Sequence, residues 1–266
     1  MRDHLRFLNA GNVGPFTLDG TRTYLVGTKS VAMIDPGPDV GDHVRALAMA
    51  VESVTELKIL LTHGHPDHAA AVGSVAQAVT RHAAERASAG SSDRFSMSVW
   101  GPKGVAGVDH VLADGDLVVT DVGSLIALHT PGHTREHLCF HWERQDALFV
   151  GDLLLGEGDT TWVAEYEGCV ADYLDSLARL RSLGLKLIYP AHGAPLEDPT
   201  NALDRFESHR RERIAQVAAA LADHPGADAA RLLEVVYGDT LPKGMRAPAL
   251  QSLGALLEYV RSVVEH

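Results

Sequence analysis

The feature that most constrains the fold is the segment LTHGHPDH, residues 61–68, which follows an apolar run. Residues 58–62 (KILLT) have the apolar character of a buried strand, and Pro66 is typical of the first turn of a helix. The polar side chains between them therefore lie on a strand-to-helix turn. These side chains are His63, His65, Asp67 and His68.

All four side chains are of metal-ligand type. Imidazole nitrogen and carboxylate oxygen are ligands that Zn²⁺ accepts, and a turn allows residues two apart to point at a common centre. A histidine-rich polar turn that binds nothing is the alternative. Buried polar clusters without partners are costly, however, and an exposed turn gives no reason for this spacing. The segment therefore predicts a metal site at one edge of a sheet.

Three further apolar runs each end in a side chain that can bind a metal. Residues 125–128 precede a Pro-Gly turn and His133. The run 147–150 leads into Asp152, and the run 185–189 leads to His192. One ligand at the carboxyl end of each predicted strand is the arrangement that a binuclear site needs.

The motifs THGHPDH, TPGHT, GD and AHG, in this order and at these intervals, resemble those of the metallo-β-lactamase superfamily of hydrolases. The resemblance implies an α/β fold, an αββα sandwich with two metals in the cleft between its sheets. It also implies which residues hold each metal. One metal would be held by His63, His65 and His133, the other by Asp67, His68 and His192, with Asp152 bridging the two.

Within the superfamily, the chain is most similar to the β-lactamase-like protein 2 group, on residues 9–27, 151–158 and 208–210. Arg22 departs from that group, which usually has Asn there. The resemblance implies a catalytic domain over residues 1–199 and a small helical, winged-helix-like appendage over residues 200–266. Helical periodicity in this tail agrees, with helices predicted at 201–221, 228–237 and 249–264.

The remaining pattern fills in the sandwich. Paired strands are predicted at 23–26 and 31–34, followed by Asp35, which is either an outer partner of a ligand histidine or a turn former. Asp39 is placed to cap a helix over 40–51. Further predictions are a helix tail and loop over 81–95, a strand at 98–100, a hairpin over 111–119 and an amphipathic helix over 172–183.

Composition limits the location and the partners. The chain of 266 residues is 45% hydrophobic and 22% charged, which is ordinary for a globular protein. It has no long apolar stretch and no apolar signal-peptide core, so we expect a cytoplasmic protein without membrane association. Cys139 and Cys169 lie in apolar contexts and are expected to be free buried thiols. The sequence does not indicate an oligomeric state.

Two divalent metals lower the pKa of a bridging water to about 7, so a metal-bridging hydroxide is the expected nucleophile. Asp67 can bind one metal and also orient this hydroxide, which makes it the candidate catalytic residue. Zinc is the expected ion, two per chain, with iron or manganese as alternatives. Diiron oxidases of this fold typically have a glutamate at the position of His65, so a redox role is not expected. The common zinc β-lactamases lack the bridging aspartate that is present here as Asp152, so a true β-lactamase of these classes is not expected either.

Three functions remain open at this point. The first is hydrolysis of a small or carrier-linked acyl ester or thioester. The second is metal-dependent endonuclease action on single-stranded RNA, which the net charge of −12 weakens because phosphate binding needs basic side chains. The third is a non-catalytic module stabilised by zinc, which is disfavoured because closed structural zinc sites use only four ligands.

His209 and Arg210 are the candidate substrate-binding residues. They lie on the predicted helix 201–221 and would hold an anionic group of the substrate. The alternative is that Arg210 caps a helix or forms a salt bridge within the helices, since acidic and basic residues are mixed along this stretch. His129, His137 and His141 are not expected to be ligands, because no motif includes them.

Overall fold

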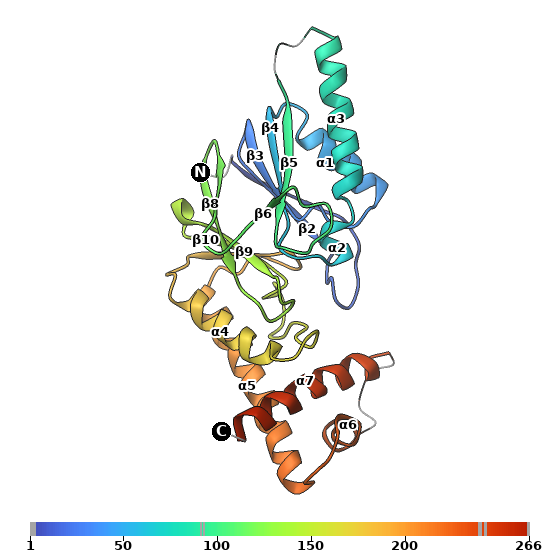
Figure 1. The fold of residues 1–266 in the computed structure, drawn as a ribbon, viewed down its shortest axis with the longest axis vertical. Helices are drawn as coiled ribbons and strands as arrows, with labels where there is room; N and C mark the ends of the chain where they lie inside the picture. Colours follow the sequence, from blue (N-terminus) through green and yellow to red (C-terminus); the bar gives the residue numbers. More distant parts are fainter. Residues whose placement is uncertain (1–3, 91, 93, 239–240, 242–243, 265–266) are drawn as a thin grey trace.

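The computed structural model describes residues 4–90, 92, 94–238, 241 and 244–264. Two β-sheets face each other and helices cover their outer faces, the αββα sandwich that the sequence predicts (Figure 1). The first sheet has the strand order β1 (Leu5–Asn9), β2 (Arg22–Val26), β3 (Ser30–Ile34), β4 (Glu56–Leu60), β5 (Ser96–Gly101), β6 (His110–Val111). The second has the order β11 (Leu187–Pro190), β10 (Ala147–Gly151), β9 (Leu138–Trp142), β8 (Gly123–His129), β7 (Leu117–Thr120).

The first sheet is parallel from β3 to β6 and antiparallel on its β1 and β2 side. Its outer face packs on α1 (Gly41–Ala50) and α3 (Val72–Ser88), whose apolar stripes bury Leu47 and Val75 completely. Between the sheets, Ile34 and Leu60 of the first pack in one cluster with Phe140 and Phe149 of the second. The sandwich therefore has an apolar core on each side of this sheet.

The second sheet is antiparallel except for the β10–β11 pair. Its outer face is covered by α4 (Cys169–Arg181), on which the predicted apolar stripe is fully confirmed. The members of the stripe, all buried, are Tyr173, Leu174, Leu177 and Leu180. A short 3₁₀ turn, η1 (Glu143–Gln145), connects β9 to β10. Cys139 and Cys169 are free and buried, as expected.

The C-terminal part consists of α5 (Pro199–Asp223), α6 (Ala229–Tyr237) and α7 (Arg246–Val264), so the predicted helical appendage is confirmed (Figure 1). The described residues after α5 begins contain no strand, and hence no wing of a winged helix. Buried side chains of α6 and α7 form one continuous hydrophobic cluster with those of β10 and α4. The division into domains at residues 199 and 200 stays a prediction.

Two local predictions were wrong. Residues 111–119 form no hairpin, because β6 ends the first sheet and β7 is the edge strand of the second. The turn between them instead carries the chain from one sheet to the other, and Asp116 accepts a hydrogen bond from the backbone N–H of Ala113 there. Asp39 does not cap α1, since Val40 is the N-cap residue and no side chain satisfies that end.

Two other segments refine the prediction. The predicted helix after Pro66 is split into α2 (Pro66–Ala69) and α3, and α3 continues through most of the 81–95 segment to Ser88. Residues 91 and 93 of that segment lie outside the described residues.

No helix in the described ranges combines the length and apolar character that crossing a bilayer requires.

Candidate metal centre and active-site cavity

The predicted ligand residues converge at the edge where the ends of both sheets meet. His63 and His65 follow β4, and Asp67 and His68 belong to α2. The second sheet supplies the other three after β8, β10 and β11. They are His133, Asp152 and His192. The β10–β11 pairing places the strand ends before Asp152 and His192 side by side, and a backbone bridge from Thr21 to His192 links them to the first sheet.

The ligand atoms form two groups, in each of which the atoms lie within 4.8 Å of one another. The first group is His63, His65 and His133, and the second is Asp67, His68, Asp152 and His192. This is the division into two sets that the sequence resemblance implies. All seven predicted ligands therefore come together, although they are distributed over residues 63–192.

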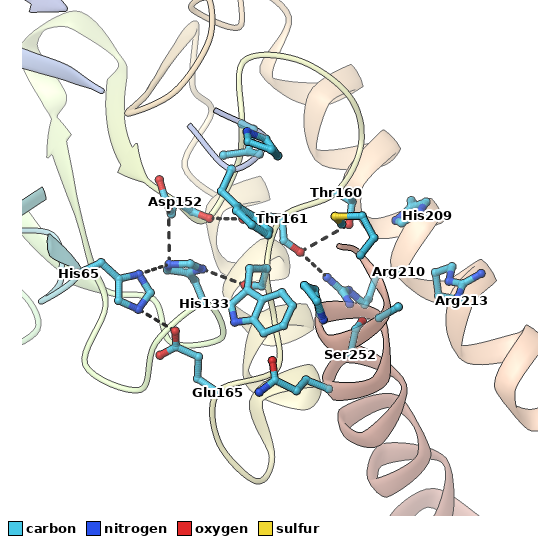
Figure 2. Close-up of a pocket in the computed structure, with 18 of the residues that line it drawn as sticks. His65, His133, Asp152, Thr160, Thr161, Glu165, His209, Arg210, Arg213 and Ser252 are labelled. Atoms are coloured by element: carbon cyan, nitrogen blue, oxygen red, sulfur yellow. Dashed lines mark hydrogen bonds and ion pairs between the residues drawn. The ribbon is translucent and has the colours of Figure 1, made fainter. Parts of the chain in front are cut away.

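Asp152 lies between the two groups. Its Oδ1 atom is 3.4 Å from Nε2 of His68 and 3.2 Å from Nε2 of His192. Its Oδ2 atom faces the first group and is 3.6 Å from Nε2 of His133 (Figure 2). One oxygen therefore points at each group, as a bridging carboxylate requires.

The site contains buried ligand atoms that lack a hydrogen-bond partner. They are Nε2 of His63, His68 and His192, and Oδ1 of Asp152. Leaving a buried polar atom unsatisfied costs about 1–3 kcal/mol, and such atoms are rare in native proteins. Lone pairs directed at a common centre are satisfied by a metal ion. The residues present therefore fit the two divalent metals that the fold implies.

The opposite nitrogen of each ligand histidine is held by an outer partner. His68 Nδ1 lies 2.9 Å from Asp35, whose carboxylate also accepts hydrogen bonds from the backbone N–H and the hydroxyl of Thr62. The parallel pairing of β3 with β4 sets this contact, because Asp35 and Thr62 follow the paired strand ends. Asp35 is thus an outer partner of a ligand histidine, the first of its two predicted roles.

The other histidines are held similarly, by partners next to strands of the first sheet and in the loop before α4. His63 Nδ1 is 3.0 Å from the Thr62 hydroxyl, and His192 Nδ1 is 3.3 Å from the Gly20 carbonyl. His133 Nδ1 lies 2.8 Å from the Trp162 carbonyl, and His65 Nε2 lies 2.6 Å from a Glu165 carboxylate oxygen. Such partners fix the ring orientation and the tautomer of a metal ligand.

Glu165 and Trp162 were missed by sequence reasoning. The loop 152–168 carries no ligand motif beyond Asp152, and a backbone carbonyl such as that of Trp162 leaves no signal in a sequence. His137, predicted not to be a ligand, lies outside the two groups of ligand atoms. Its ring lies 5.3 Å from that of His63, and its Nδ1 is 3.1 Å from the Thr130 hydroxyl.

Glycine is required where β10 ends. Gly151 has a φ of 49°, and a Cβ there would lie 2.7 Å from both His137 Nε2 and the Thr62 hydroxyl oxygen. The Gly-Asp motif therefore serves the packing behind the site as well as the ligand set.

The charges in the cluster favour a cation at its centre. Burial opposes protonation of His68, but the carboxylates of Asp152 and Asp35 outweigh it and raise the pKa of His68 well above its usual range. His192 behaves similarly, with its pKa raised to about 9 by Asp152 despite burial. His63 differs, because burial and its histidine neighbours lower its pKa well below the usual range. The buried carboxylates thus hold positive charge, which divalent metals supply.

A cavity of about 720 Å³ opens from the metal-binding cluster toward the C-terminal helices. Asp67, Asp152 and Glu165 line its inner end. The other walls come from three places. They are the loop with Pro15 and Phe16, the 155–165 loop, and side chains of α5 to α7 and their connections. The appendage therefore forms part of the active-site wall.

His209 and Arg210 both line this cavity (Figure 2). Arg210 is only 3% exposed and donates a hydrogen bond from Nη2 to the Thr161 carbonyl, at 3.0 Å. Its guanidinium also lies over the Tyr173 ring, 5.2 Å from the centroid. Among the described residues it has no carboxylate partner, so the predicted alternative of a salt bridge within the helices is not observed.

Comparison with known proteins identifies the family. Residues 16–192 match the model of the Metallo-beta-lactamase superfamily. The chain belongs to this superfamily. The sequence is 30% identical over 255 residues to a beta-lactamase-like protein 2 homolog of Caenorhabditis elegans, covering 93% of this chain and 80% of that protein. The superfamily assignment and the ligand cluster together indicate a metal-dependent hydrolase.

Two fungal relatives of this metallo-β-lactamase superfamily member are also similar. The lactamase-like protein aptB of Emericella nidulans is 35% identical over 224 residues, which cover 83% of this chain and 66% of that protein. The chain thus spans slightly less than two thirds of aptB. An atrochrysone carboxyl ACP thioesterase of Aspergillus chevalieri is 32% identical over 253 residues, covering 91% of this chain and 75% of that enzyme.

Solved structures show the same fold over nearly the whole chain. A metallo-beta-lactamase family protein from Thermus thermophilus superposes with a TM-score of 0.72 at 24% identity, covering 98% of this chain and 94% of that one. A beta-lactamase domain protein from Burkholderia ambifaria gives a TM-score of 0.81 at 20% identity, covering 98% and 87%. At these identities the likeness concerns the fold alone.

Proposed function

We propose that this metal-dependent hydrolase binds two zinc ions and cleaves a carrier-linked acyl thioester. The observation that carries the proposal is the bridging position of Asp152. Its two oxygens face two separate sets of ligand atoms at the inner end of a large cavity. Seven ligand residues with a shared carboxylate exceed what a closed structural site uses, so the cluster is suited to catalysis.

The metal assignment follows the donor chemistry. His63, His65 and His133 would hold one ion, and Asp67, His68 and His192 the other, with Asp152 shared. Five imidazoles and two carboxylates suit zinc, and iron or manganese are the alternatives that this donor set also accepts. When bound, the two ions lower the pKa of a water to about 7 and polarise the carbonyl oxygen of the substrate.

Asp67 is the proposed catalytic residue. Its carboxylate is part-exposed to the cavity, and its Oδ2 atom is 3.3 Å from Nε2 of His192 and 3.7 Å from Nε2 of His68. This oxygen lies with the two Nε2 atoms in the second ligand group, and the cavity side of the carboxylate remains accessible to water. Asp67 therefore orients the attacking water and accepts its proton, as a general base within hydrogen-bond reach does.

The substrate class rests on the cavity and on one relative. A volume of about 720 Å³ is in the range of sites for small organic molecules, and Leu155, Trp162 and Met245 give it apolar wall. The Aspergillus chevalieri relative is named as a thioesterase acting on an acyl carrier protein. An acyl group in this cavity would place its thioester carbonyl at the metal cluster and leave the carrier arm outside.

The test is a substrate panel with the zinc-loaded, full-length protein, including acyl-carrier thioesters, oxygen esters, a phosphodiester and single-stranded RNA. We expect thioester hydrolysis that chelation abolishes and zinc restores. Metal-dependent cleavage of RNA with no thioester turnover would contradict the proposed substrate class.

The two free thiols fit the cytoplasmic location predicted from sequence. Localisation of a tagged protein in the source cells can test this location.

A further inference from the structure

We propose that the cavity selects an acyl group that carries its own carboxylate, and that Arg210 binds this second anionic group. The inference deepens the proposed thioesterase function and rests on it for the reaction. The observation behind it is a buried guanidinium, 3% exposed, that faces the cavity without an ion-pair partner among the described residues.

The contacts that Arg210 makes within the protein do not neutralise its positive charge. Nη2 donates to the Thr161 carbonyl and the ring of Tyr173 lies beneath the guanidinium, but Nε has no hydrogen-bond partner. Burial lowers the pKa of Arg210, yet an arginine stays charged in a protein. Burying a cation without a counter-ion has a high free-energy cost. A carboxylate ligand would offset this cost, because its two oxygens can accept a pair of hydrogen bonds from the guanidinium.

The neighbouring charges agree. Among the described residues, the acidic groups that line the cavity are Asp67, Asp152 and Glu165, and each of them faces a histidine of the metal cluster. At the other end Arg213 contacts the neutral side chains of Gln216 and Tyr237. The cavity is therefore acidic at its inner end and basic beside α5, and Figure 2 shows these two ends on opposite sides of the site.

The position of Arg210 favours the acyl side of the substrate over the carrier arm. Thr161 connects Arg210 to the metal cluster, because its carbonyl accepts from Arg210 and its hydroxyl donates to the Asp152 carbonyl at 2.7 Å. Arg210 is thus linked to the proposed metal ligand Asp152 through one residue, Thr161. The phosphate of a pantetheine arm lies much farther from its thioester. The anion that meets Arg210 is accordingly attached to the acyl chain.

The first experiment compares paired thioesters in the zinc-loaded, full-length protein. N-acetylcysteamine monothioesters of the dicarboxylic acids from succinic to suberic are compared with the same compounds in which the free carboxylate is a methyl ester. We expect the best acid to have the higher kcat/KM. Arg210→Met should lower the acid-to-ester ratio of kcat/KM about 10- to 100-fold, the scale of one hydrogen-bonded charge pair.

The matched control is Arg211→Met, one residue along the same helix. Arg211 is ion-paired with Glu207 at 2.8 Å and does not line the cavity. This variant should keep the parent ratio of kcat/KM. If Arg210 serves only to hold Thr161, Arg210→Met would slow both members of every pair equally and lower the midpoint of thermal unfolding, which would overturn the proposal.

A binding measurement separates this inference from the proposed reaction. Calorimetry with the same zinc-loaded protein compares 4-phenylbutyrate with its neutral amide. Tighter binding of the acid that Arg210→Met removes supports the anion site even if no thioester is hydrolysed. A preference that survives Arg210→Met belongs to the metals and contradicts the proposal. So does an Arg210 effect that appears only with phosphopantetheine thioesters, since it would place the anion on the carrier arm.

Discussion

At the scale of single residues, the site depends on two carboxylates, each of which contacts several neighbouring side chains. Asp152 faces both ligand groups with its two oxygens, and Asp35 holds His68 and Thr62 with its own two. Both carboxylates are nearly fully buried, so neither charge can be compensated by water. Removing one charge therefore disturbs several ligands together.

Asp67→Asn keeps the size of the side chain and removes its charge. We expect kcat on the best thioester to fall at least about 100-fold, because a positioned general base is lost, while the fold is kept. Steady-state kinetics with metal content measured on the same sample tests this. Asp159→Asn is the control, since Asp159 is exposed and does not line the cavity. Full activity of Asp67→Asn with both ions bound would show that Asp67 has no catalytic role.

Asp35→Asn tests the outer partner of His68. An amide cannot reproduce all the hydrogen bonds that the carboxylate accepts, so His68 loses its fixed orientation. We expect the metal site that includes His68 to lose affinity by about 10- to 100-fold, measured by competition with a chromophoric chelator. Asp39→Asn, an exposed aspartate without a capping bond, should leave the affinity unchanged. Equal affinities in all three proteins would contradict this role of Asp35.

At the scale of elements, the C-terminal helices contribute both to the core and to the cavity. The loop 152–168 lies between these helices and the metal cluster. It contacts the ligand side through the Trp162 carbonyl and Glu165, and it contacts α7 through a hydrogen bond from Gly168 N–H to Glu258. The appendage therefore supports the residues that orient two of the ligands.

Deletion of α5 to α7 by ending the chain after Asp198 should give a protein that aggregates or lacks activity. The reason is that apolar surface of α4 and β10, now covered by the appendage, would be exposed. Size-exclusion chromatography and the thioesterase assay measure the two outcomes. A monomeric and fully active truncated protein would mean that the tail is an independent module.

Single substitutions measure how firmly these helices pack. Leu232 of α6 is completely buried, so Leu232→Ala should lower the free energy of unfolding by about 2–5 kcal/mol. Leu250 of α7 is 37% exposed, and Leu250→Ala should change it by less than about 1 kcal/mol. Denaturant titration of the zinc-loaded protein compares the two. A small effect of Leu232→Ala would show that α6 is loosely attached.

At the scale of the whole molecule, the two sheets are joined at the edge that carries the ligands. Backbone hydrogen bonds link Leu138 N–H to the Thr62 carbonyl and Arg22 N–H to the Ala191 carbonyl, both at 2.8 Å. Metals bound by His63 of one sheet and His133 of the other would join the sheets further. Metal binding and stability of the sandwich should thus be coupled.

Removal of the metals should therefore lower the midpoint of thermal unfolding. Elemental analysis should find about two divalent ions per chain in the loaded protein, and chelation should destabilise it by about 3 kcal/mol for each ion removed if the free metal was near 100 times its dissociation constant. One ion or fewer after careful loading would contradict the binuclear assignment. An unchanged unfolding midpoint after complete chelation would show that the sheets do not depend on the metals.

The sequence alone determined which side chains gather at the candidate metal site, and it determined the fold class. Ligand chemistry demands particular residue types, and each of His63, His133, Asp152 and His192 follows an apolar strand, so local pattern and resemblance together were sufficient. The apolar stripe of α4 was predictable for a similar reason, because burial of one helix face leaves a period in the sequence.

Only the tertiary structure decided which distant residues meet. Glu165 reaches His65 from a distant part of the chain, and the Trp162 partner of His133 is a backbone carbonyl. The separation of β6 from β7 was missed because a turn signal does not tell whether the next strand joins the same sheet. Arg210 was a candidate substrate-binding residue from sequence, but its burial with no carboxylate partner among the described residues follows from long-range packing that no local pattern records.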